Sequence, residues 1–230
     1  MRKIPKSVMM FAAGFGRRMG NLTKDTPKPL IRVAGVPLID HTLCLVREIN
    51  SDHIVANVHY LPDALVNHFR GSEVALSHES PDILETGGGL KHALPLLGKG
   101  PVFTTNTDAI WQGPNPFMLA LSHWAPSTMD ALTVCIPTEN AIGHSGQGDF
   151  RLSSQGKVSR GPGVVYGGVQ ILKTDGLFGI QEASFSLNRL WDNMIANGTL
   201  YGVIYPGKWC DVGSAEGIAL AENLLRDTHV

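Results

Sequence analysis

Short apolar runs alternate with longer amphipathic segments through the first 136 residues, and this alternation limits the chain to few architectures. Five of the runs have the length of a buried strand: Ser7–Ala12, Ile54–His59, Val74–Ser77, Val102–Thr105 and Ala131–Ile136. Four segments between them carry apolar residues at three- and four-residue spacing, with proline near three of the starts: Pro37–Ile49, Pro62–Arg70, Gly88–Leu97 and Pro116–Trp124. Repeated strand-then-helix order predicts an α/β fold with a doubly wound, mostly parallel sheet, in which ligands bind beyond the carboxyl ends of the strands.

The pattern changes after Pro137. A polar, glycine-rich stretch from Gly143 to Asp149 is followed by two short pieces that predict a small β-hairpin insert, Phe150–Leu152 and Lys157–Ser159. The remainder predicts strand, helix, strand and helix in turn: Val164–Leu172, Leu187–Asn197, Leu200–Tyr205 and Ser214–Leu225. No short-period repeat of glycine and aliphatic residues follows Tyr205, which excludes an appended β-helical domain. We therefore expect a single domain over residues 1–230.

Charge and cysteine content exclude several classes of partner. Nineteen Lys and Arg residues against twenty Asp and Glu give a net charge of -1, so no overall positive field draws the chain to nucleic acid or to an anionic membrane. The three cysteines are widely spaced and include no Cys-x-x-Cys pair, which argues against a disulfide scaffold or a zinc ribbon. The apolar run Val8–Ala13 is too short for a signal peptide or a membrane span. We expect a cytoplasmic protein with no nucleic-acid or membrane partner.

The loop after the first strand has the composition of a phosphate-binding turn. Small residues would let the backbone approach a phosphate chain, and arginines would add positive charge, in the string Ala12-Ala13-Gly14-Phe15-Gly16-Arg17-Arg18. The string is neither a P-loop nor a Gly-x-Gly-x-x-Gly fingerprint, and a tight turn with solvated arginines fits it equally well. Lys28 is the next candidate, because Pro27 and Pro29 restrict its backbone on both sides, although prolines also mark ordinary loops.

Two aspartates are candidates for a metal site. Asp108 follows a predicted central strand and Asp211 precedes the last predicted helix. An aspartate in such a place is often a cap or a turn residue, but two carboxylates from distant strand ends can hold one Mg²⁺ while phosphate oxygens and water fill its other positions.

A run of glycines precedes the third predicted helix, in the string Leu84-Glu85-Thr86-Gly87-Gly88-Gly89. We expect Thr86 to cap this helix and the glycines to let a flat base pack against the backbone. A capped turn alone would explain Thr86 and one glycine.

These motifs resemble those of the sugar-1-phosphate nucleotidyltransferases, whose opening motif Ala-Ala-Gly-x-Gly-x-Arg-Met/Leu is followed at short distance by Pro-Lys-Pro. Further strings fall in family order across nearly the whole chain: Asn57-Val58-His59-Tyr60-Leu61, Leu84-Glu85-Thr86-Gly87-Gly88-Gly89, Asn106-Thr107-Asp108-Ala109-Ile110-Trp111, Gly146-Gln147-Gly148-Asp149-Phe150 and Trp209-Cys210-Asp211-Val212-Gly213. The glycine string, the tryptophan soon after Asp108 and the compact length are most similar to members that act on N-acetylmuramic acid 1-phosphate.

The resemblance implies a Rossmann-like nucleotidyltransferase fold with a nucleotide-binding half, residues 1–136, and a sugar-binding half, residues 137–230, that carries the hairpin insert. The implied partners are a nucleoside triphosphate, UTP in particular, and a sugar 1-phosphate, with Mg²⁺ as cofactor on Asp108 and Asp211 and a monomer or homodimer as the assembly. The implied catalytic residues are Arg18, Lys28, Asp108 and Asp211. The implied nucleotide contacts are Ala12, Ala13, Gly14, Gly16, Arg18, Lys28, Glu85, Gly87, Gly88 and Asn106. The implied sugar contacts are Asp149, Gly168 and Glu182.

The sequence departs from the family pattern at two places. Thr107 stands where the family usually has the glycine of Asn-Gly-Asp. A β-branched residue there is expected to crowd the space beside the metal. Gly20-Asn21 replaces the usual proline and should loosen the first loop. A carboxylate on the sugar would need a cation, for which Lys208, Arg160 and His144 are candidates, and His59 is a possible neighbour of the site.

Three other functions remain open on the sequence. The chain could transfer a uridylyl, thymidylyl or guanylyl group to a hexose or heptose 1-phosphate, because the shared motifs do not read the sugar. It could be a nucleotide-sugar-binding regulatory module without turnover, although the four charged site residues argue against this. It could also be a cytidylyltransferase, which usually carries different basic residues in the first loop.

Overall fold

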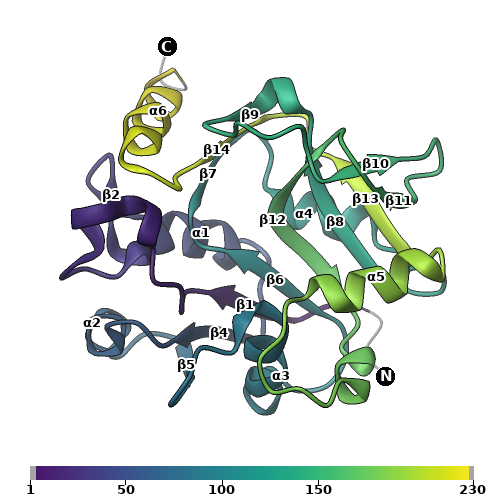
Figure 1. Ribbon diagram of the computed structural model, residues 1–230, viewed down its shortest axis with the longest axis horizontal. Coiled ribbons are helices and arrows are strands. Elements are labelled where there is room, and N and C mark those ends of the chain that lie inside the picture. The colour runs from purple at the N-terminus through teal and green to yellow at the C-terminus, as the bar shows by residue number, and fades with distance from the viewer. Residues whose placement is uncertain (1–3, 228–230) are drawn as a thin grey trace.

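The computed structural model describes residues 4–227 and is built on a seven-stranded sheet with the strand order β13-β8-β12-β6-β1-β4-β5 (Figure 1). Its strands are β1 (Ser7–Phe11), β4 (His53–Val58), β5 (Val74–His78), β6 (Val102–Asn106), β8 (Ala131–Ile136), β12 (Val165–Leu172) and β13 (Leu200–Ile204). Neighbouring strands run parallel except around β12, which is antiparallel to both β6 and β8. The predicted mostly parallel sheet is confirmed.

Helices cover both faces of this sheet, because its strands are apolar on both sides. In β1, Val8 and Met10 point into one core and Met9 into the other, and all three are fully buried. The helices are α1 (Leu38–Arg47), α2 (Pro62–His68), α3 (Glu85–Leu97), α4 (Pro116–His123), α5 (Asn188–Ala196) and α6 (Ala215–Arg226). Helices α1, α2 and α4 pack in the first core, and α3 and α5 pack in the second (Figure 1). The fold is therefore doubly wound, as predicted.

A small sheet beside the main one brings two distant segments together. It has the order β7-β14-β9 and joins β7 (Ala109–Gln112), β14 (Lys208–Asp211) and β9 (Ala141–Ile142). Cys210 on β14 and Ile110 on β7 pack with Ala221 and Leu224 of α6 in a third apolar cluster. The local sequence pattern does not predict these short strands, and they carry Asp211 to the segment that follows Asp108.

Short elements complete the chain. The hairpins are β2 (Arg32–Val33) with β3 (Val36–Pro37) and β10 (Phe150–Leu152) with β11 (Val158–Arg160), and the 3₁₀ segments are Arg17–Thr23, Lys28–Leu30, Thr138–Asn140 and Asp175–Gly179. The second hairpin is the predicted insert. Helix α3 begins at Glu85, three residues before its predicted start at Gly88, since the glycines are helical. Within residues 4–227 no helix combines the length and the apolar character that a membrane crossing requires.

Candidate functional site

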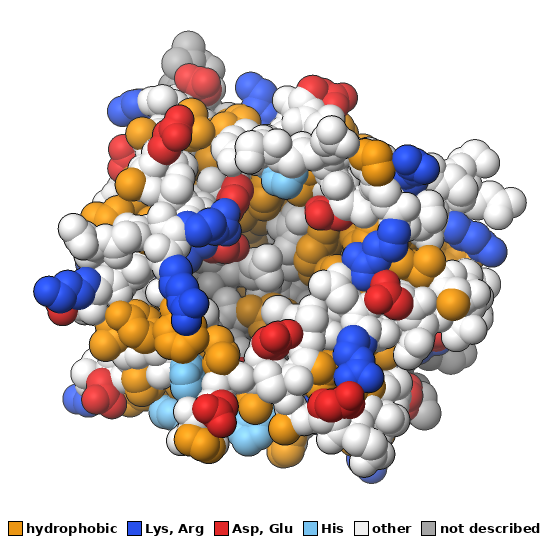
Figure 2. Space-filling model, viewed as in Figure 1, with side chains coloured by type: hydrophobic (Ala, Val, Ile, Leu, Met, Phe, Trp, Pro, Cys, Tyr) orange, Lys and Arg blue, Asp and Glu red, His pale blue; other side chains and the backbone are white. Residues whose placement is uncertain are grey.

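A cleft of about 400 Å³ lies at the carboxyl ends of the central strands, where a doubly wound sheet binds its ligands. Figure 2 shows it as the hollow in the middle of that face, with basic and acidic side chains around its rim. Most of the residues that the sequence pointed to line it: Ala12, Ala13, Gly14, Gly16, Arg18, Lys28, Glu85, Asn106 and Asp108. Gly87, Gly88 and Asp211 do not.

The first loop folds back on itself through a glycine. Gly16 has φ +61°, and a Cβ there would lie 2.9 Å from both the Lys28 Cβ and the Thr23 Cγ2 atoms, so only glycine fits. The Thr23 hydroxyl donates to the Gly16 carbonyl at 3.2 Å. The Tyr60 hydroxyl also holds the loop, by donating to the Thr23 carbonyl at 2.9 Å. The loop therefore presents Lys28 to the cleft from a fixed backbone.

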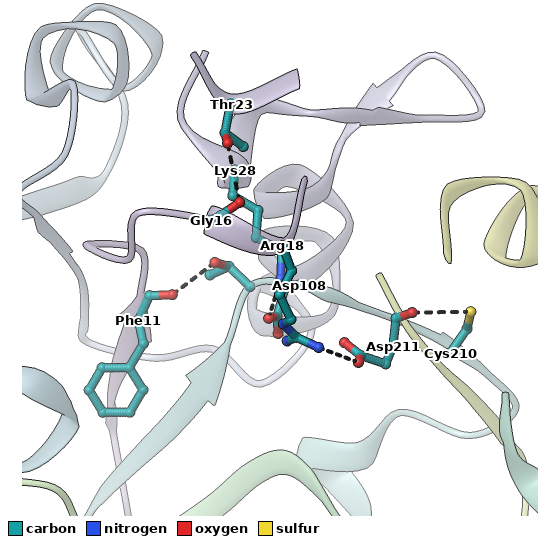
Figure 3. A network of polar contacts seen from close by, with 9 residues as sticks. Phe11, Gly16, Arg18, Thr23, Lys28, Asp108, Cys210 and Asp211 are labelled. Carbon is teal, nitrogen blue, oxygen red and sulfur yellow. Dashed lines mark hydrogen bonds and ion pairs between the residues drawn. The ribbon is translucent and has the colours of Figure 1, made fainter. Parts of the chain in front are cut away.

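Lys28 and Asp108 form the central ion pair of the cleft (Figure 3). The Lys28 Nζ atom lies 2.6 Å from the Asp108 Oδ2 atom, and the lysine side chain is only 12% exposed. Asp108 lies between the last residue of β6 and the first of β7, which confirms its predicted place at the end of a central strand. When a ligand binds, the Lys28 ammonium can instead pair with a phosphate, and the Asp108 carboxylate can pair with a second cation.

A second, looser pair joins Arg18 to Asp211. Their Nη1 and Oδ2 atoms are 3.5 Å apart, and the Arg18 side chain is 70% exposed, so it is free to move (Figure 3). Its guanidinium lies over Gly213, where a Cβ would come within 2.5 Å of Nη1. Burial and the charge of Asp108 raise the pKa of Asp211, and the charges of Arg18 and Lys28 only partly oppose this.

The two aspartates converge because their strands pair. Asp211 is in register with Ala109, and the Val212 amide donates to the Asp108 carbonyl at 2.9 Å. Within residues 4–227 no group of three or more His, Cys, Asp and Glu side chains could hold a metal ion. Two hard oxygen ligands nevertheless suit Mg²⁺, which is commonly held by one or two carboxylates with water and substrate phosphates at its other positions. The donor set fits a cation that binds together with a phosphate-bearing ligand.

Asn57 and Glu79 are site residues for which the sequence analysis gave no role. Both line the cleft and both are 3% exposed. Asn57 accepts from the Ala12 amide at 2.7 Å and donates to Glu79 at 2.6 Å, and the other Glu79 oxygen accepts from the Leu84 amide at 2.7 Å. This chain of bonds ties the first loop to the start of α3. Their position near the ends of β4 and β5 was the signal that could have found them.

The glycine run of α3 has a packing function, which the sequence interpretation did not include. The Gly87 and Gly88 amides both donate to the Phe185 carbonyl, at 2.8 and 3.0 Å. A Cβ on Gly87 would lie 2.4 Å from the Phe185 ring, and one on Gly88 would lie 2.1 Å from the Ala183 carbonyl oxygen. Both amides are bonded and the Cβ sides are filled, so neither glycine offers its N–H group to a base. Thr86 is no cap either, since its hydroxyl accepts from the Leu187 amide at 3.0 Å.

Glu85 stands apart from the glycines that follow it. It lines the cleft and has φ +57°, which is unusual for a residue with a side chain. Such strained backbone clusters at ligand sites, and the sequence gives no warning of it.

Thr107 lines the cleft beside Asp108. It is buried, and its hydroxyl donates to the Phe11 carbonyl at 2.8 Å, across the ends of β6 and β1. The expectation that Thr107 crowds the space beside the metal stays a prediction. Thr107 links the two strands whose ends form the floor of the cleft.

A second cleft, of about 290 Å³, adjoins the first and shares Phe11, Thr86 and Asn106 with it. Its other walls come from the hairpin insert, β12 and the segment that leads into α5. Asp149 lines it and accepts from the Tyr166 amide at 2.8 Å. Arg160 lines it as well.

The remaining residues expected to contact the sugar lie elsewhere. Gly168 has φ +96°, and the absence of a side chain there makes room for Asn106. A Cβ added at Gly168 would lie 3.1 Å from the Asn106 Cβ atom. Glu182 lies in a separate depression and forms an ion pair of 2.6 Å with Arg189, whose hydrogen bond lowers the pKa of Glu182. Neither Lys208 nor His144 lines either cleft.

His59 adjoins the first loop without lining the cleft. Its ring packs in a T-shaped arrangement with the Phe15 ring, with 5.6 Å between the centroids, and its Nδ1 atom lies 3.0 Å from the Glu79 carbonyl oxygen. It is a neighbour of the site, as expected.

Comparison with known proteins agrees with this geometry. Residues 8–146 match the model of the MobA-like NTP transferase domain. The chain is 38% identical, over 99% of its length and all of the relative, to the N-acetylmuramate alpha-1-phosphate uridylyltransferase of Caulobacter vibrioides. It is 33% identical to the protein of that name from Neisseria meningitidis serogroup B, over 90% of this chain and 92% of the relative. Its fold is similar to the crystal structure of a UDP-glucose pyrophosphorylase complexed with UDP-glucose, with a TM-score of 0.78, 16% identity, and coverage of 98% of this chain and 100% of that one.

Proposed function

The chain belongs to the sugar-1-phosphate nucleotidyltransferases of the MobA-like NTP transferase family, and we propose that it transfers UMP from UTP to N-acetylmuramic acid 1-phosphate. One observation carries the proposal beyond the similarity. Two clefts meet at Phe11, Thr86 and Asn106. The Lys28–Asp108 ion pair lies in the larger of the two, and Asp108 follows Asn106 by two residues in the chain. A donor and an acceptor substrate could thus lie side by side, with charged groups near the point where they meet.

The reaction needs positioning and charge neutralisation rather than a general base. A phosphate oxygen of the sugar 1-phosphate attacks the α-phosphorus of UTP, a new P–O bond forms, and the bond between the α-phosphorus and its bridging oxygen breaks as pyrophosphate leaves. Because the nucleophile is already an anion, no side chain has to take a proton from it.

Lys28 and Arg18 supply the positive charge. The partly buried Lys28 stabilises negative charge on the α-phosphate, because its ammonium is held in a fixed place by the first loop. The exposed Arg18 neutralises the leaving pyrophosphate and moves with it. Asp108 and Asp211 would hold Mg²⁺, whose charge would reduce the repulsion between the two substrates.

The first loop and the start of α3 hold the nucleotide from two sides. Within residues 4–227 the Gly14 amide has no backbone acceptor, and a Cβ at Gly14 would meet nothing within 4 Å, so a phosphate chain can approach this backbone closely. Glu85 and Thr86, on the other side, are the residues of the glycine string that line the cleft. The base therefore contacts Glu85 rather than Gly87 or Gly88.

The test is a grid of pyrophosphate-release assays. UTP, dTTP, GTP, CTP and ATP are crossed with the 1-phosphates of N-acetylmuramic acid, N-acetylglucosamine, glucose and mannose, with Mg²⁺ and with Mg²⁺ removed by a chelator. We expect release with UTP and the muramic sugar, and its loss on chelation and in Asp108→Asn. Asp63→Asn, which neutralises an exposed aspartate of α2 outside both clefts, is the control. Turnover confined to another pair would overturn the proposed substrates, and nucleotide binding without any turnover would overturn the activity.

A further inference from the structure

Arg160 is the one basic side chain among the residues that line the second cleft, counting the described part of the chain. It ends β11, in the hairpin insert, and projects beside the start of α5. The other charged side chain in this wall is Asp149. An anionic group entering this cleft would therefore have a single cation to bind.

The Arg160 guanidinium is held in one orientation. Its Nε and Nη2 atoms donate to the same oxygen of Asp192, at 3.0 and 2.8 Å, and Nη2 also donates to Asn188 at 2.8 Å. Its Cζ atom lies 5.3 Å from the centre of the Phe150 ring and 5.7 Å from that of Trp191. Within residues 4–227 its Nη1 atom has no acceptor. Two N–H groups thus stay available on a guanidinium whose place is already fixed.

The ring beneath Arg160 is fixed in turn by a buried polar chain. The Trp191 Nε1 atom donates to Gln170 at 2.9 Å, and Gln170 donates to the Thr104 hydroxyl at 3.0 Å. Gln170 and Thr104 are fully buried between the sheet and α5. Because these bonds orient the indole, the platform for Arg160 does not have to form when a ligand arrives.

We propose that Arg160 recognises the carboxylate of an acidic acceptor sugar and so determines which sugar 1-phosphates react. The inference rests on the proposed function, since N-acetylmuramic acid differs from N-acetylglucosamine by a lactyl ether that ends in a carboxylate. A planar guanidinium with free N–H groups matches a carboxylate in shape and charge. Without Arg160, the carboxylates of Asp149 and Asp192 would repel the acidic sugar, whereas a sugar without a carboxylate would lose little affinity.

The experiment compares two sugars that differ at this group alone. Arg160→Gln and Arg160→Lys are assayed with UTP and either N-acetylmuramic acid 1-phosphate or N-acetylglucosamine 1-phosphate, and the binding of each sugar phosphate is measured by calorimetry. We expect Arg160→Gln to raise KM for the muramic sugar about 10- to 100-fold, the range of one charge-assisted hydrogen bond, and to leave KM for the other within about twofold. Arg160→Lys keeps the positive charge beside Asp192, so it should raise KM for the muramic sugar less than Arg160→Gln does.

Arg47→Gln is the matched control, because Arg47 is also an exposed arginine, 2.7 Å from Glu73, but lies outside both clefts. It should change neither KM. Equal losses for both sugars in the Arg160 variants would overturn the inference and assign Arg160 to the shared phosphate or to the fold. Unchanged KM for both sugars would overturn it as well.

A second sugar pair separates this inference from the proposed substrate. Glucuronic acid 1-phosphate and glucose 1-phosphate again differ by a carboxylate. If the wild-type protein ignores the muramic sugar but prefers the glucuronic sugar, and Arg160→Gln removes that preference, the substrate proposal fails and the role of Arg160 stands. If the wild-type protein prefers no carboxylate in either pair, the role of Arg160 fails.

Discussion

Two glycines of the site, Gly88 and Gly14, are expected to respond to the same Gly-to-Ala change in opposite ways. In Gly88→Ala the new Cβ would lie 2.1 Å from the Ala183 carbonyl oxygen, so the segment that follows Ala183 must move away from α3. That movement breaks the hydrogen bonds of the Gly87 and Gly88 amides to the Phe185 carbonyl. Two lost bonds at about 1 kcal/mol each and overpacking of about 1 to 3 kcal/mol outweigh a helix-propensity gain of about 1 kcal/mol.

The free energy of unfolding of Gly88→Ala should therefore fall by about 2 to 4 kcal/mol, which corresponds to roughly 5 to 15 °C in Tm for a chain of this length. Gly14→Ala should keep or slightly raise stability, because Gly14 has no positive φ and its Cβ would meet nothing within 4 Å. The same Cβ would project where phosphates approach the backbone, so the affinity for UTP should fall at least about tenfold.

Thermal unfolding followed by circular dichroism and calorimetric titration with UTP measure the two effects separately. Gly179→Ala is the control, because Gly179 also lacks a positive φ and contacts within 4 Å but lies outside both clefts. It should change neither quantity. A Gly88→Ala protein with wild-type Tm and no affinity for UTP would refute the packing argument and return the glycine run to base recognition.

Substitutions at four further residues test the charges and the floor of the cleft. Arg18→Ala and Lys28→Ala should each lower kcat/KM about 100-fold or more with little change in Tm, since both act on phosphate charge; near wild-type rates in both would contradict the assignments. Asp211→Asn should abolish turnover yet raise the free energy of unfolding at neutral pH, because burial raises the pKa of Asp211 and makes its charged form unfavourable in the folded protein. This gain should disappear in acid, below the pKa, where wild-type Asp211 is protonated too, and urea unfolding at several pH values would show a gain independent of pH if the reasoning is wrong. Thr107→Val should lower the free energy of unfolding by about 1 kcal/mol, because it removes the hydrogen bond to the Phe11 carbonyl, whereas Thr107→Ser should keep that bond. Equal stability of the two variants would contradict the role of the bond.

The sequence predicts the sheet and half of the site because both depend on local pattern. Strands that are apolar on both sides, such as Ser7–Phe11, can only be buried between two layers of helices, and their carboxyl ends follow from the chain direction. That is why the first loop and Asp108 were found in the right place. Asn57 and Glu79 follow the same rule and could have been found with it.

Contacts between distant segments were beyond local pattern. Nothing near Gly87 and Gly88 in the sequence announces that Phe185 packs against them, so three glycines in a row suggested a ligand. The place of Asp211 depends on a four-residue strand, β14, which is too short to show periodicity. The hydroxyl of Thr107 likewise bonds across two strands, which neither its β-branched shape nor its neighbours in the sequence indicate.

The ion pairs of the cleft explain how a chain of net charge -1 can keep a site for highly charged substrates. Lys28 and Arg18 each face a carboxylate, so the site is close to neutral in itself and costs little desolvation of unpaired charge. A triphosphate that binds the two cations leaves Asp108 and Asp211 without their partners, and the pKa of Asp211 is already raised by the nearness of Asp108. The two carboxylates then lack a counter-charge, so we expect the binding of a divalent cation and of the triphosphate to be mutually favourable. The positive charge that attracts the substrate is therefore local, and Lys28 and Arg18 leave their carboxylate partners only when the substrate binds.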